Sequence, residues 1–276
     1  KTNQEVTKVL ESDTDSMFSV HFVNELKHIK DKSRVIFLAQ AWNKEDIEKL
    51  VGMGVRWFVV DNESDLNELI KYLEFNDKEI NKDNSNDKNI ITNNEKTNEN
   101  TIKKEENNKI NLLLRIKLKE LTIRTEKYFV FGMDSNTINN SIKKLRKNNK
   151  IKKLGVHFHR KTQNMAEWNL KYEISNIIED LSLIDIINIG GGIPSVYANT
   201  NEDVIRTVFD KIKEFKDSLK DIQLIIEPGR FIAAPAVKLQ TSIIGIDKNN
   251  IIVNASVYNS DMDAIIVPVK LLVDGE

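Results

Sequence analysis

The sequence predicts an α/β fold, a parallel (β/α)8 barrel that lacks its first strand and is followed by the start of a β domain. Short apolar runs alternate with amphipathic segments along most of the chain, the pattern of parallel strands joined by helices. The 276 residues suit a barrel, which commonly takes roughly 250 residues in one domain. Near the end, strand-like runs follow one another without helices. We therefore expect a barrel over residues 1–235 and a truncated β domain over 236–276.

Seven candidate strands follow one another along the predicted barrel. They cover residues 17–22, 34–39, 55–60, 111–118, 153–158, 184–189 and 222–227. Helical patterns fall at residues 4–11, 43–52, 63–74, 135–147, 167–181 and 202–218. Asn62 and Asn201 directly precede two of these helices, where an amide oxygen can cap the helix N-terminus. Seven candidate strands suggest an eight-stranded barrel that lacks only its first strand.

Two segments depart from the barrel pattern. Residues 76–109 are rich in Asn, Lys and Glu and have almost no apolar side chain to bury, so we expect a disordered insertion. Its charges are mixed, which favours a solvated linker over a binding tail. After Pro228, residues 236–246, 250–258 and 264–273 read as successive strands of the β domain.

Composition excludes several classes of function. With 41 basic and 42 acidic residues the net charge is −1, so no overall field attracts nucleic acid or an anionic membrane. The absence of cysteine removes disulfides, thiolate zinc sites and cysteine nucleophiles. No apolar run approaches the roughly 20 residues of a membrane span, and no secretory signal is present. We expect a cytoplasmic protein whose partner is a small molecule.

Two motifs lie where barrel active sites are built, at the ends of the sixth and seventh candidate strands. Gly190, Gly191 and Gly192 follow a buried strand, and residues without a Cβ let successive N–H groups turn toward one anion. A tight turn is the alternative, but barrels favour phosphate sites at this position in the strand order. Glu227 and Arg230 end the next strand, where they form either an ordinary ion pair or a site for a ring nitrogen and a phosphate.

Three further side chains are candidates within strands. Alternation along a strand directs His157 and His159 to the same face, with Phe158 opposite. Two histidines can ligate a metal, but no third ligand stands nearby in the sequence, so we expect no metal. Arg115 lies among apolar residues, and it either meets an anion inside the barrel or points outward at the rim.

Together, these motifs resemble the pyridoxal-phosphate (PLP) dependent ornithine, diaminopimelate and arginine decarboxylases, which are built on the alanine-racemase type of TIM barrel. The order and spacing fit along nearly the whole chain, from Lys1-Thr2-Asn3 through Asn24-Glu25-Leu26 and Val59-Val60-Asp61-Asn62 to the glycine loop and Glu227-Pro228-Gly229-Arg230. The glycine loop followed by EPGR is specific as a pair. The resemblance implies PLP as cofactor and a homodimer with active sites between the subunits.

The resemblance assigns a role to each candidate. It makes Lys1 the residue that holds PLP as a Schiff base, His159 the ring that stacks on the pyridine, and Arg115 a cofactor-site arginine. Glu227 would pair with the pyridine nitrogen. The phosphate would be held by Thr162, Gly190, Gly191, Gly192 and Arg230. Racemases of this fold are similar but use an arginine at the ring nitrogen, so Glu227 favours a decarboxylase.

The implied reaction is decarboxylation of a basic or diamino acid, of the ornithine, lysine or arginine type. Diaminopimelate is the nearest rival substrate. A non-catalytic relative, similar to the antizyme inhibitors, and a barrel for another phosphorylated ligand are the alternatives. Retention of Lys1, His159 and EPGR argues against the first of these, and Lys1 and Glu227 would be unnecessary in the second.

The chain departs from the family pattern at three points. Ser19 follows the aromatic Phe18, where the family usually carries an acidic residue. Residues 160–163 replace the usual glycine-rich segment after the second histidine. The part of the β domain that carries a cysteine, an aspartate and a tyrosine for the partner subunit's site is not in this chain. We therefore expect that this chain binds PLP without necessarily turning over substrate.

Overall fold

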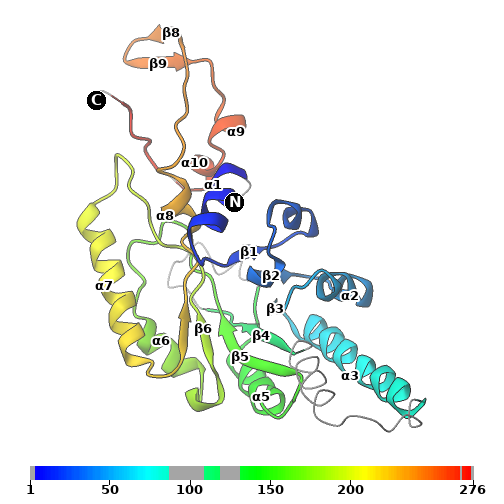
Figure 1. Ribbon diagram of the computed structural model, residues 1–276. Coiled ribbons are helices and arrows are strands. Elements are labelled where there is room, and N and C mark those ends of the chain that lie inside the picture. Colours follow the sequence, from blue (N-terminus) through cyan, green and yellow to red (C-terminus); the bar gives the residue numbers. More distant parts are fainter. Residues whose placement is uncertain (1–3, 87–108, 119–130, 268, 275–276) are drawn as a thin grey trace.

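The computed structural model describes residues 4–86, 109–118, 131–267 and 269–274. Its main feature is a sheet of seven parallel strands, each paired with its neighbours in sequence, that curls into an open barrel wall (Figure 1). The strands are β1 (Phe18–Val20), β2 (Val35–Ala39), β3 (Trp57–Val60), β4 (Ile110–Arg115), β5 (Ile151–His157), β6 (Ile186–Asn188) and β7 (Gln223–Ile225). All seven lie within or overlap the predicted ranges, which confirms the α/β barrel. Within the described residues no further strand joins β1 to β7.

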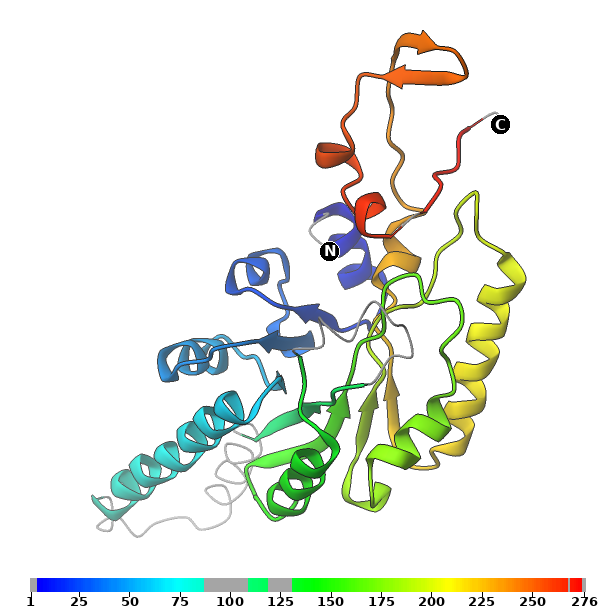
Figure 2. The ribbon, with the colours of Figure 1, turned by 180° about the vertical axis from the view of Figure 1, so that it is seen from behind.

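Helices cover the outer face of this sheet, as Figure 2 shows from behind. The larger helices are α1 (Gln4–Asp13), α2 (Lys44–Gly52), α3 (Glu63–Asn86), α5 (Ser135–Leu145), α6 (Leu170–Ile177) and α7 (Glu202–Ser218). Short helical turns are η1 (Val23–His28), η2 (Lys32–Arg34), η4 (Leu181–Leu183) and α8 (Gly229–Ala233). No helix in the described residues is both long and apolar enough to cross a membrane.

Strand alternation divides the apolar side chains between two cores. The larger core lies between sheet and helices and includes the fully buried Phe58 and Phe158. The smaller core lies on the other face, inside the barrel. It consists of Ile36, Leu38, Val59, Leu113 and Ile186. Successive residues of a strand face opposite sides of the sheet. Polar residues that lie two positions beyond the side chains of the inner core therefore also face the inside of the barrel, at the carboxyl ends of the strands.

Helix α3 is longer than the sequence predicts. It runs to Asn86, through the first part of the segment for which disorder was expected from residue 76, and that expectation is wrong for 76–86. A helix satisfies its backbone groups internally, so a helix whose first turns are packed can continue into a polar segment. The rest of the expected insertion, 87–108, lies outside the described residues, and residue 109 precedes β4. The assignment of domain boundaries stays a prediction.

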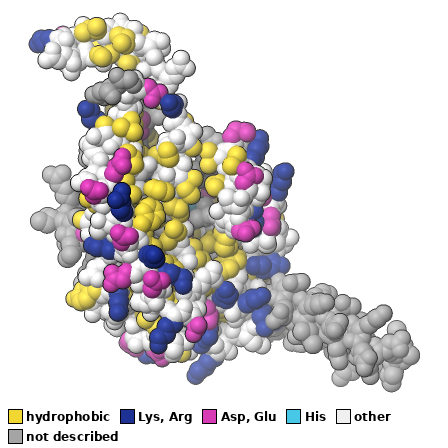
Figure 3. All heavy atoms as spheres, turned by 60° about the vertical axis from the view of Figure 1, so that its left-hand side comes forward, with side chains coloured by type: hydrophobic (Ala, Val, Ile, Leu, Met, Phe, Trp, Pro, Cys, Tyr) yellow, Lys and Arg dark blue, Asp and Glu magenta, His cyan; other side chains and the backbone are white. Residues whose placement is uncertain are grey.

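The C-terminal part differs from the three strands expected there. Strands β8 (Ile243–Asp247) and β9 (Asn250–Val253) form an antiparallel hairpin that projects away from the barrel (Figure 1). The isoleucines of the hairpin are exposed, and Figure 3 shows hydrophobic side chains on the surface of this projection. The expected strand at 264–273 is wrong, since α9 (Val257–Ser260) and α10 (Asp263–Ile266) are followed by irregular chain. The backbone of Lys270 does not pair with a strand. Its carbonyl oxygen accepts a hydrogen bond from Ala198 N, and its N–H donates to Asn199 Oδ1, at 2.8 Å each.

Both predicted helix caps are present. Asn62 Oδ1 accepts a hydrogen bond from Asp65 N at 2.9 Å, and Asn201 Oδ1 accepts from Asp203 N at 2.9 Å. We expect Asn201→Ala to lower the free energy of unfolding by about 1 kcal/mol, because a backbone donor at the start of α7 loses its acceptor. Asn201→Asp keeps an acceptor and serves as the control. Urea denaturation of the three proteins checks this, and equal stabilities of the alanine variant and wild type would contradict it.

Candidate cofactor-binding site

Polar side chains line the carboxyl ends of β3 to β7 on the inner face of the barrel. Asp61 follows β3, Arg115 and His157 end β4 and β5, Asn188 ends β6, and Glu227 follows β7. Each continues the alternation of the apolar residues of the inner core, which is why five separate strands deliver polar groups to one place. The end of a barrel that carries such residues is the end where active sites are built.

The glycine loop packs tightly against the end of β5. An ideal Cβ at position 190 would lie 2.1 Å from the carbonyl oxygen of Phe158, and one at position 192 would lie 2.7 Å from Arg160 Cβ. Gly190 and Gly192 also have positive φ angles of 62° and 97°, which side chains rarely tolerate. Glycine is therefore required here by both space and backbone conformation. The tight turn and the anion cradle that the sequence left open are compatible in this loop.

His159 is held by this loop in one tautomer. Gly191 N–H donates to His159 Nδ1 at 3.0 Å, so the proton of the neutral ring is on Nε2. Nε2 lies 3.4 Å from Glu227 Oε2. The pKa of His159 is lowered because burial penalises its charged form, while Glu227 opposes the shift and Arg115 adds to it. His159 is therefore a neutral ring at the wall of the site, in agreement with the same-face prediction for the two histidines.

His157 lies directly beneath His159 and is fully buried. The two rings meet edge to face, with centroids 4.6 Å apart and planes at 84°. Burial lowers the pKa of His157 well below 6.5, and the neighbouring His159 and Arg115 lower it further. Neither ring nitrogen has a hydrogen-bond partner among the described residues, although Nε2 lies 3.6 Å from Glu227 Oε1. Such unpaired buried nitrogens are costly.

Glu227 joins the two histidines, and sequence spacing could not show this. Its Oε1 accepts a hydrogen bond from Asn188 Nδ2 at 2.8 Å. Ligand-capable atoms of His157, His159 and Glu227 all lie within 4.8 Å of one another, so the third ligand that the sequence lacked is present. However, Gly191 already uses the lone pair on His159 Nδ1 and leaves a proton on Nε2. That tautomer opposes metal ligation through Nε2, so the absence of a metal stays a prediction.

Arg115 meets an anion inside the barrel, one of the two alternatives open from the sequence. Its Nη1 lies 2.8 Å from Asp61 Oδ1, and only 4% of the Asp61 side chain is exposed. Gln40 Nε2 donates to the other oxygen of Asp61 at 2.8 Å. The Arg115 guanidinium also lies over the ring of Phe131, 4.9 Å from its centroid. The sequence did not identify Asp61 as this partner. Its position two residues after Val59 does place its side chain on the same face of the sheet, inside the barrel.

Arg230 and Thr162 meet on the other side of the glycine loop. Arg230 Nε donates to Thr162 Oγ1 at 2.9 Å, and its Nη1 donates to the hydroxyl of Tyr197 at 3.2 Å. The Cβ position at Gly192 lies 2.9 Å from the carbonyl oxygen of Lys161, which places this pair next to the loop. The structure thus brings Thr162, Arg230 and the glycines together, and their role in holding a phosphate stays a prediction. Lys1 lies outside the described residues.

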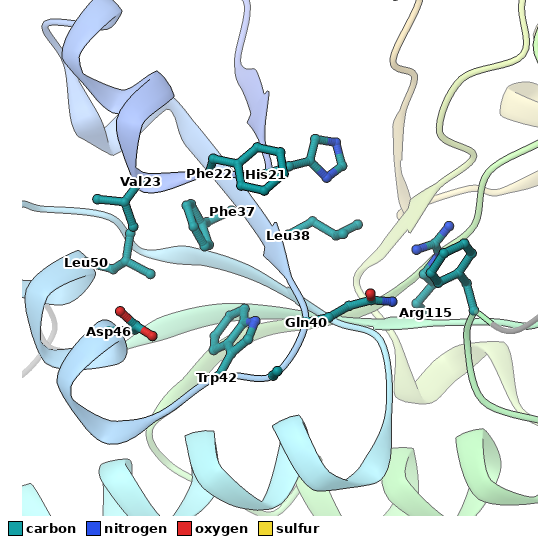
Figure 4. A pocket seen from close by; sticks show the side chains of 12 residues that line it. His21, Phe22, Val23, Phe37, Leu38, Gln40, Trp42, Asp46, Leu50 and Arg115 are labelled. Atoms are coloured by element: carbon teal, nitrogen blue, oxygen red, sulfur yellow. The ribbon is translucent and has the colours of Figure 1, made fainter.

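A hollow of about 550 Å³, lined in part by Arg115, opens between the ends of β1 and β2 and helix α2 (Figure 4). Most of its lining is apolar and includes Phe37, Leu38 and Trp42, and Gln40 extends along its floor toward Arg115 (Figure 4). Ser19, on β1, has a buried hydroxyl without a partner among the described residues. This side of the mouth is therefore less polar than the side at β5 to β7.

The two buried histidines predict how stability depends on pH. Their pKa values are lowered in the folded protein, so below about pH 6.5 the unfolded chain binds more protons and stability falls. Each histidine contributes up to about 1.4 kcal/mol per pH unit between 6.5 and its folded pKa. We expect His157→Gln to flatten this slope in urea unfolding between pH 5 and 7.5. Phe158→Leu, a buried neighbour without a titratable group, should be less stable with the slope unchanged; an unaltered slope in His157→Gln would refute the assignment.

The residues present fit a phosphorylated pyridine cofactor. The tightly packed backbone at Gly190 and Gly192 lies next to the hydrogen-bonded pair of Thr162 and Arg230. Backbone N–H groups and a guanidinium together form a site for an anion. Glu227 and His159, with its buried Nε2, give a carboxylate and a neutral ring for the aromatic part. The two parts are joined by Gly191, which contacts His159 and whose Cβ position lies 3.3 Å from the Glu227 carbonyl oxygen.

Comparison with known proteins agrees with this geometry. A curated ornithine decarboxylase of Panagrellus redivivus is 27% identical over 145 residues, which cover 49% of this chain and 33% of that protein. The match thus spans about a third of the relative's length.

Solved structures share the fold. A lysine/ornithine decarboxylase from Vibrio vulnificus, complexed with cadaverine, has a TM-score of 0.69 at 19% identity, covering 98% of this chain and 66% of its own. A diaminopimelate decarboxylase from M. jannaschi has a TM-score of 0.65 at 20% identity, covering 98% and 61%. At these identities the likeness shows the fold, and it confirms the barrel of alanine-racemase type.

The profile of one protein family matches residues 76–234, more than half of the chain. Its description is pyridoxal-dependent decarboxylase, pyridoxal binding domain. The matched range contains the two histidines, the glycine loop and EPGR. The chain belongs to the pyridoxal-dependent decarboxylase family and contains its pyridoxal-binding domain.

Proposed function

We propose that this chain is the cofactor-binding part of a PLP-dependent decarboxylase for a basic or diamino acid, of the ornithine, lysine or arginine type. The observation that carries the proposal is the position of Glu227, whose carboxylate faces a neutral His159 next to the glycine loop. In the reaction, the bond from the α-carbon to the carboxylate breaks, CO₂ leaves, and a proton takes its place. When bound, PLP supplies the electron sink that this step needs.

The residues of the chain divide the work of binding and orientation. Gly190, Gly191 and Gly192 with Thr162 and Arg230 would hold the phosphate. His159 would pack on one face of the ring, and Glu227 would keep the ring nitrogen protonated. Arg115, already paired with Asp61, adds a positive charge to the mouth. Lys1 would attach the cofactor covalently.

Covalent trapping tests the proposal. The full-length protein is incubated with PLP, reduced with borohydride, and digested for mass mapping of the labelled lysine. We expect the label on Lys1, and CO₂ release from a panel of ornithine, lysine, arginine and meso-diaminopimelate, with a basic substrate preferred. Preference for meso-diaminopimelate would assign the neighbouring function. Labelling without CO₂ release would favour a non-catalytic, regulatory relative, and a protein without labelled lysine would overturn the proposal.

The setting of the enzyme follows from the same proposal. A homodimer with sites between the subunits is expected for a member of this family, and a cytoplasmic location suits a small-molecule enzyme. Sedimentation of the full-length protein checks the first, since a monomer at micromolar concentration would contradict it. Fractionation of cells checks the second.

A further inference from the structure

We propose that His157 is a positioning residue that holds the Glu227 carboxylate in the direction required by the ring nitrogen of the cofactor. The inference rests on the proposed function and adds to it a residue outside the predicted site. His157 touches neither the glycine loop nor the Arg230 cluster in the contacts described above. Its place in the structure is behind Glu227, on the buried side.

The contacts of Glu227 define what His157 does. Asn188 Nδ2 donates to Oε1 at 2.8 Å, and His157 Nε2 faces the same oxygen at 3.6 Å. The other oxygen, Oε2, faces His159. Oε1 is therefore directed into the protein and Oε2 toward the mouth. Asn188 alone would let the carboxylate rotate about its last bond, whereas a second group at Oε1 limits that rotation.

The state of His157 suits this role. Its side chain is completely buried, and a lowered pKa keeps it neutral. A neutral imidazole has one N–H, and Glu227 Oε1 is the acceptor that faces its Nε2 within the described part of the chain. A neutral donor can orient the carboxylate without cancelling its charge, which a protonated histidine or a lysine would do. Arg115, His21 and His159 all oppose protonation of His157.

If His157 only filled space, an apolar side chain would be expected at this position. The ring fills space between the inner core and the mouth, and any apolar residue of similar volume would do that without two costly nitrogens. The neighbouring Phe158 shows that role, since it is fully buried and faces the helices on the opposite side of β5. The position of a polar ring at 157 is explained when the nitrogen acts on Glu227.

Two substitutions at His157 separate the roles. His157→Gln keeps an N–H near the position of Nε2, whereas His157→Leu keeps apolar volume and removes the donor. Phe158→Leu is the matched control, because it loosens the same strand without facing Glu227. For each protein we would determine the cofactor-free crystal structure, the absorbance of bound PLP as a function of pH, and kcat and KM with the preferred amino acid.

We expect the Glu227 carboxylate to rotate or become disordered in His157→Leu and to stay in place in the other two variants. We expect kcat of His157→Leu to fall about tenfold with KM changed less than about twofold, because the buried polar group that faces Glu227 Oε1 at 3.6 Å is lost and the carboxylate is oriented less well. The pH at which the spectrum of bound PLP changes should shift in this variant alone. His157→Gln should recover most of kcat.

The outcomes distinguish this inference from the proposed function. If wild type releases no CO₂ from any amino acid, the proposed function fails, while the orientation of Glu227 in the cofactor-free crystals still decides the role of His157. If Glu227 keeps its orientation in His157→Leu, and kcat and the spectrum match those of Phe158→Leu, His157 is a packing residue and the inference is wrong. Should His157→Leu not fold, failure of His157→Gln to keep the wild-type orientation and spectrum would overturn it.

Discussion

Gly190→Ala is expected to destabilise the protein by roughly 2 to 5 kcal/mol and to abolish measurable PLP binding at micromolar cofactor. The new methyl group would lie 2.1 Å from the carbonyl oxygen of Phe158, so backbone must shift, and the φ angle of 62° is unfavourable for alanine. A shift of the loop also breaks the bonds on both of its sides. Gly190 N donates to Asn188 Oδ1 at 2.9 Å, and Glu227 N donates to Gly190 O at 2.8 Å.

Gly52→Ala provides the control for this substitution. Gly52 ends helix α2, its Cβ position meets no atom within 4 Å, and its φ angle is not positive. We expect this variant to bind PLP like wild type and to be equally stable or slightly more stable. Urea denaturation and fluorescence titration with PLP measure both effects. PLP affinity in Gly190→Ala within about threefold of wild type would show that the loop does not form the phosphate site.

The fold follows from the sequence wherever local pattern decides it. Apolar runs of the length of buried strands, separated by amphipathic segments, specify parallel strands with helices between them. The prediction fails where a segment has no such partner. Residues 264–273 are apolar enough for a strand, but a strand requires a ladder, and Lys270 bonds to Ala198 and Asn199 instead. Helix α3 continues past residue 76 because a helix needs no distant partner.

For the site residues, the sequence can predict the direction of a side chain but not its contact partner. The shared face of His157 and His159 follows from alternation along their strand, and the structure brings the two rings into contact. The sequence left the direction of Arg115 open, and the structure pairs it with Asp61 inside the barrel. Their partners do not follow, because Asp61 and Glu227 come from strands far away in the sequence. Asn188 shows a further limit: it stood beside the glycine motif, but its role as a donor to Glu227 depends on the register of β6 and β7.

Glu227→Gln is expected to lower kcat by about 10² to 10³ while leaving the affinity for PLP within several-fold of wild type. The substitution preserves shape and removes the negative charge that would keep the ring nitrogen protonated. Binding should persist, because Thr162, Arg230 and the glycine loop do not contact the carboxylate in the hydrogen bonds and ion pairs of the described residues. The loss should therefore be seen in the chemical step.

The surroundings of Glu227 add to this effect. Asn188 donates to one oxygen, and the protonated Nε2 of His159 faces the other at 3.4 Å. An amide has one oxygen, so if it accepts from Asn188, its NH₂ group must face the His159 N–H. We expect this conflict to displace the side chain, and the crystal structure of the variant would show it.

Glu179→Gln is the matched control for Glu227→Gln. Glu179 pairs with Lys143 at 2.7 Å on the surface, and more than half of its side chain is exposed, at 58%. Its neutralisation should leave kcat unchanged, since exposed pairs contribute little. Steady-state kinetics and the absorbance spectrum of bound PLP across pH compare the three proteins. If kcat of Glu227→Gln stays within about threefold of wild type, the carboxylate does not sustain the electron sink. The decarboxylase assignment would then need another residue to protonate the ring nitrogen.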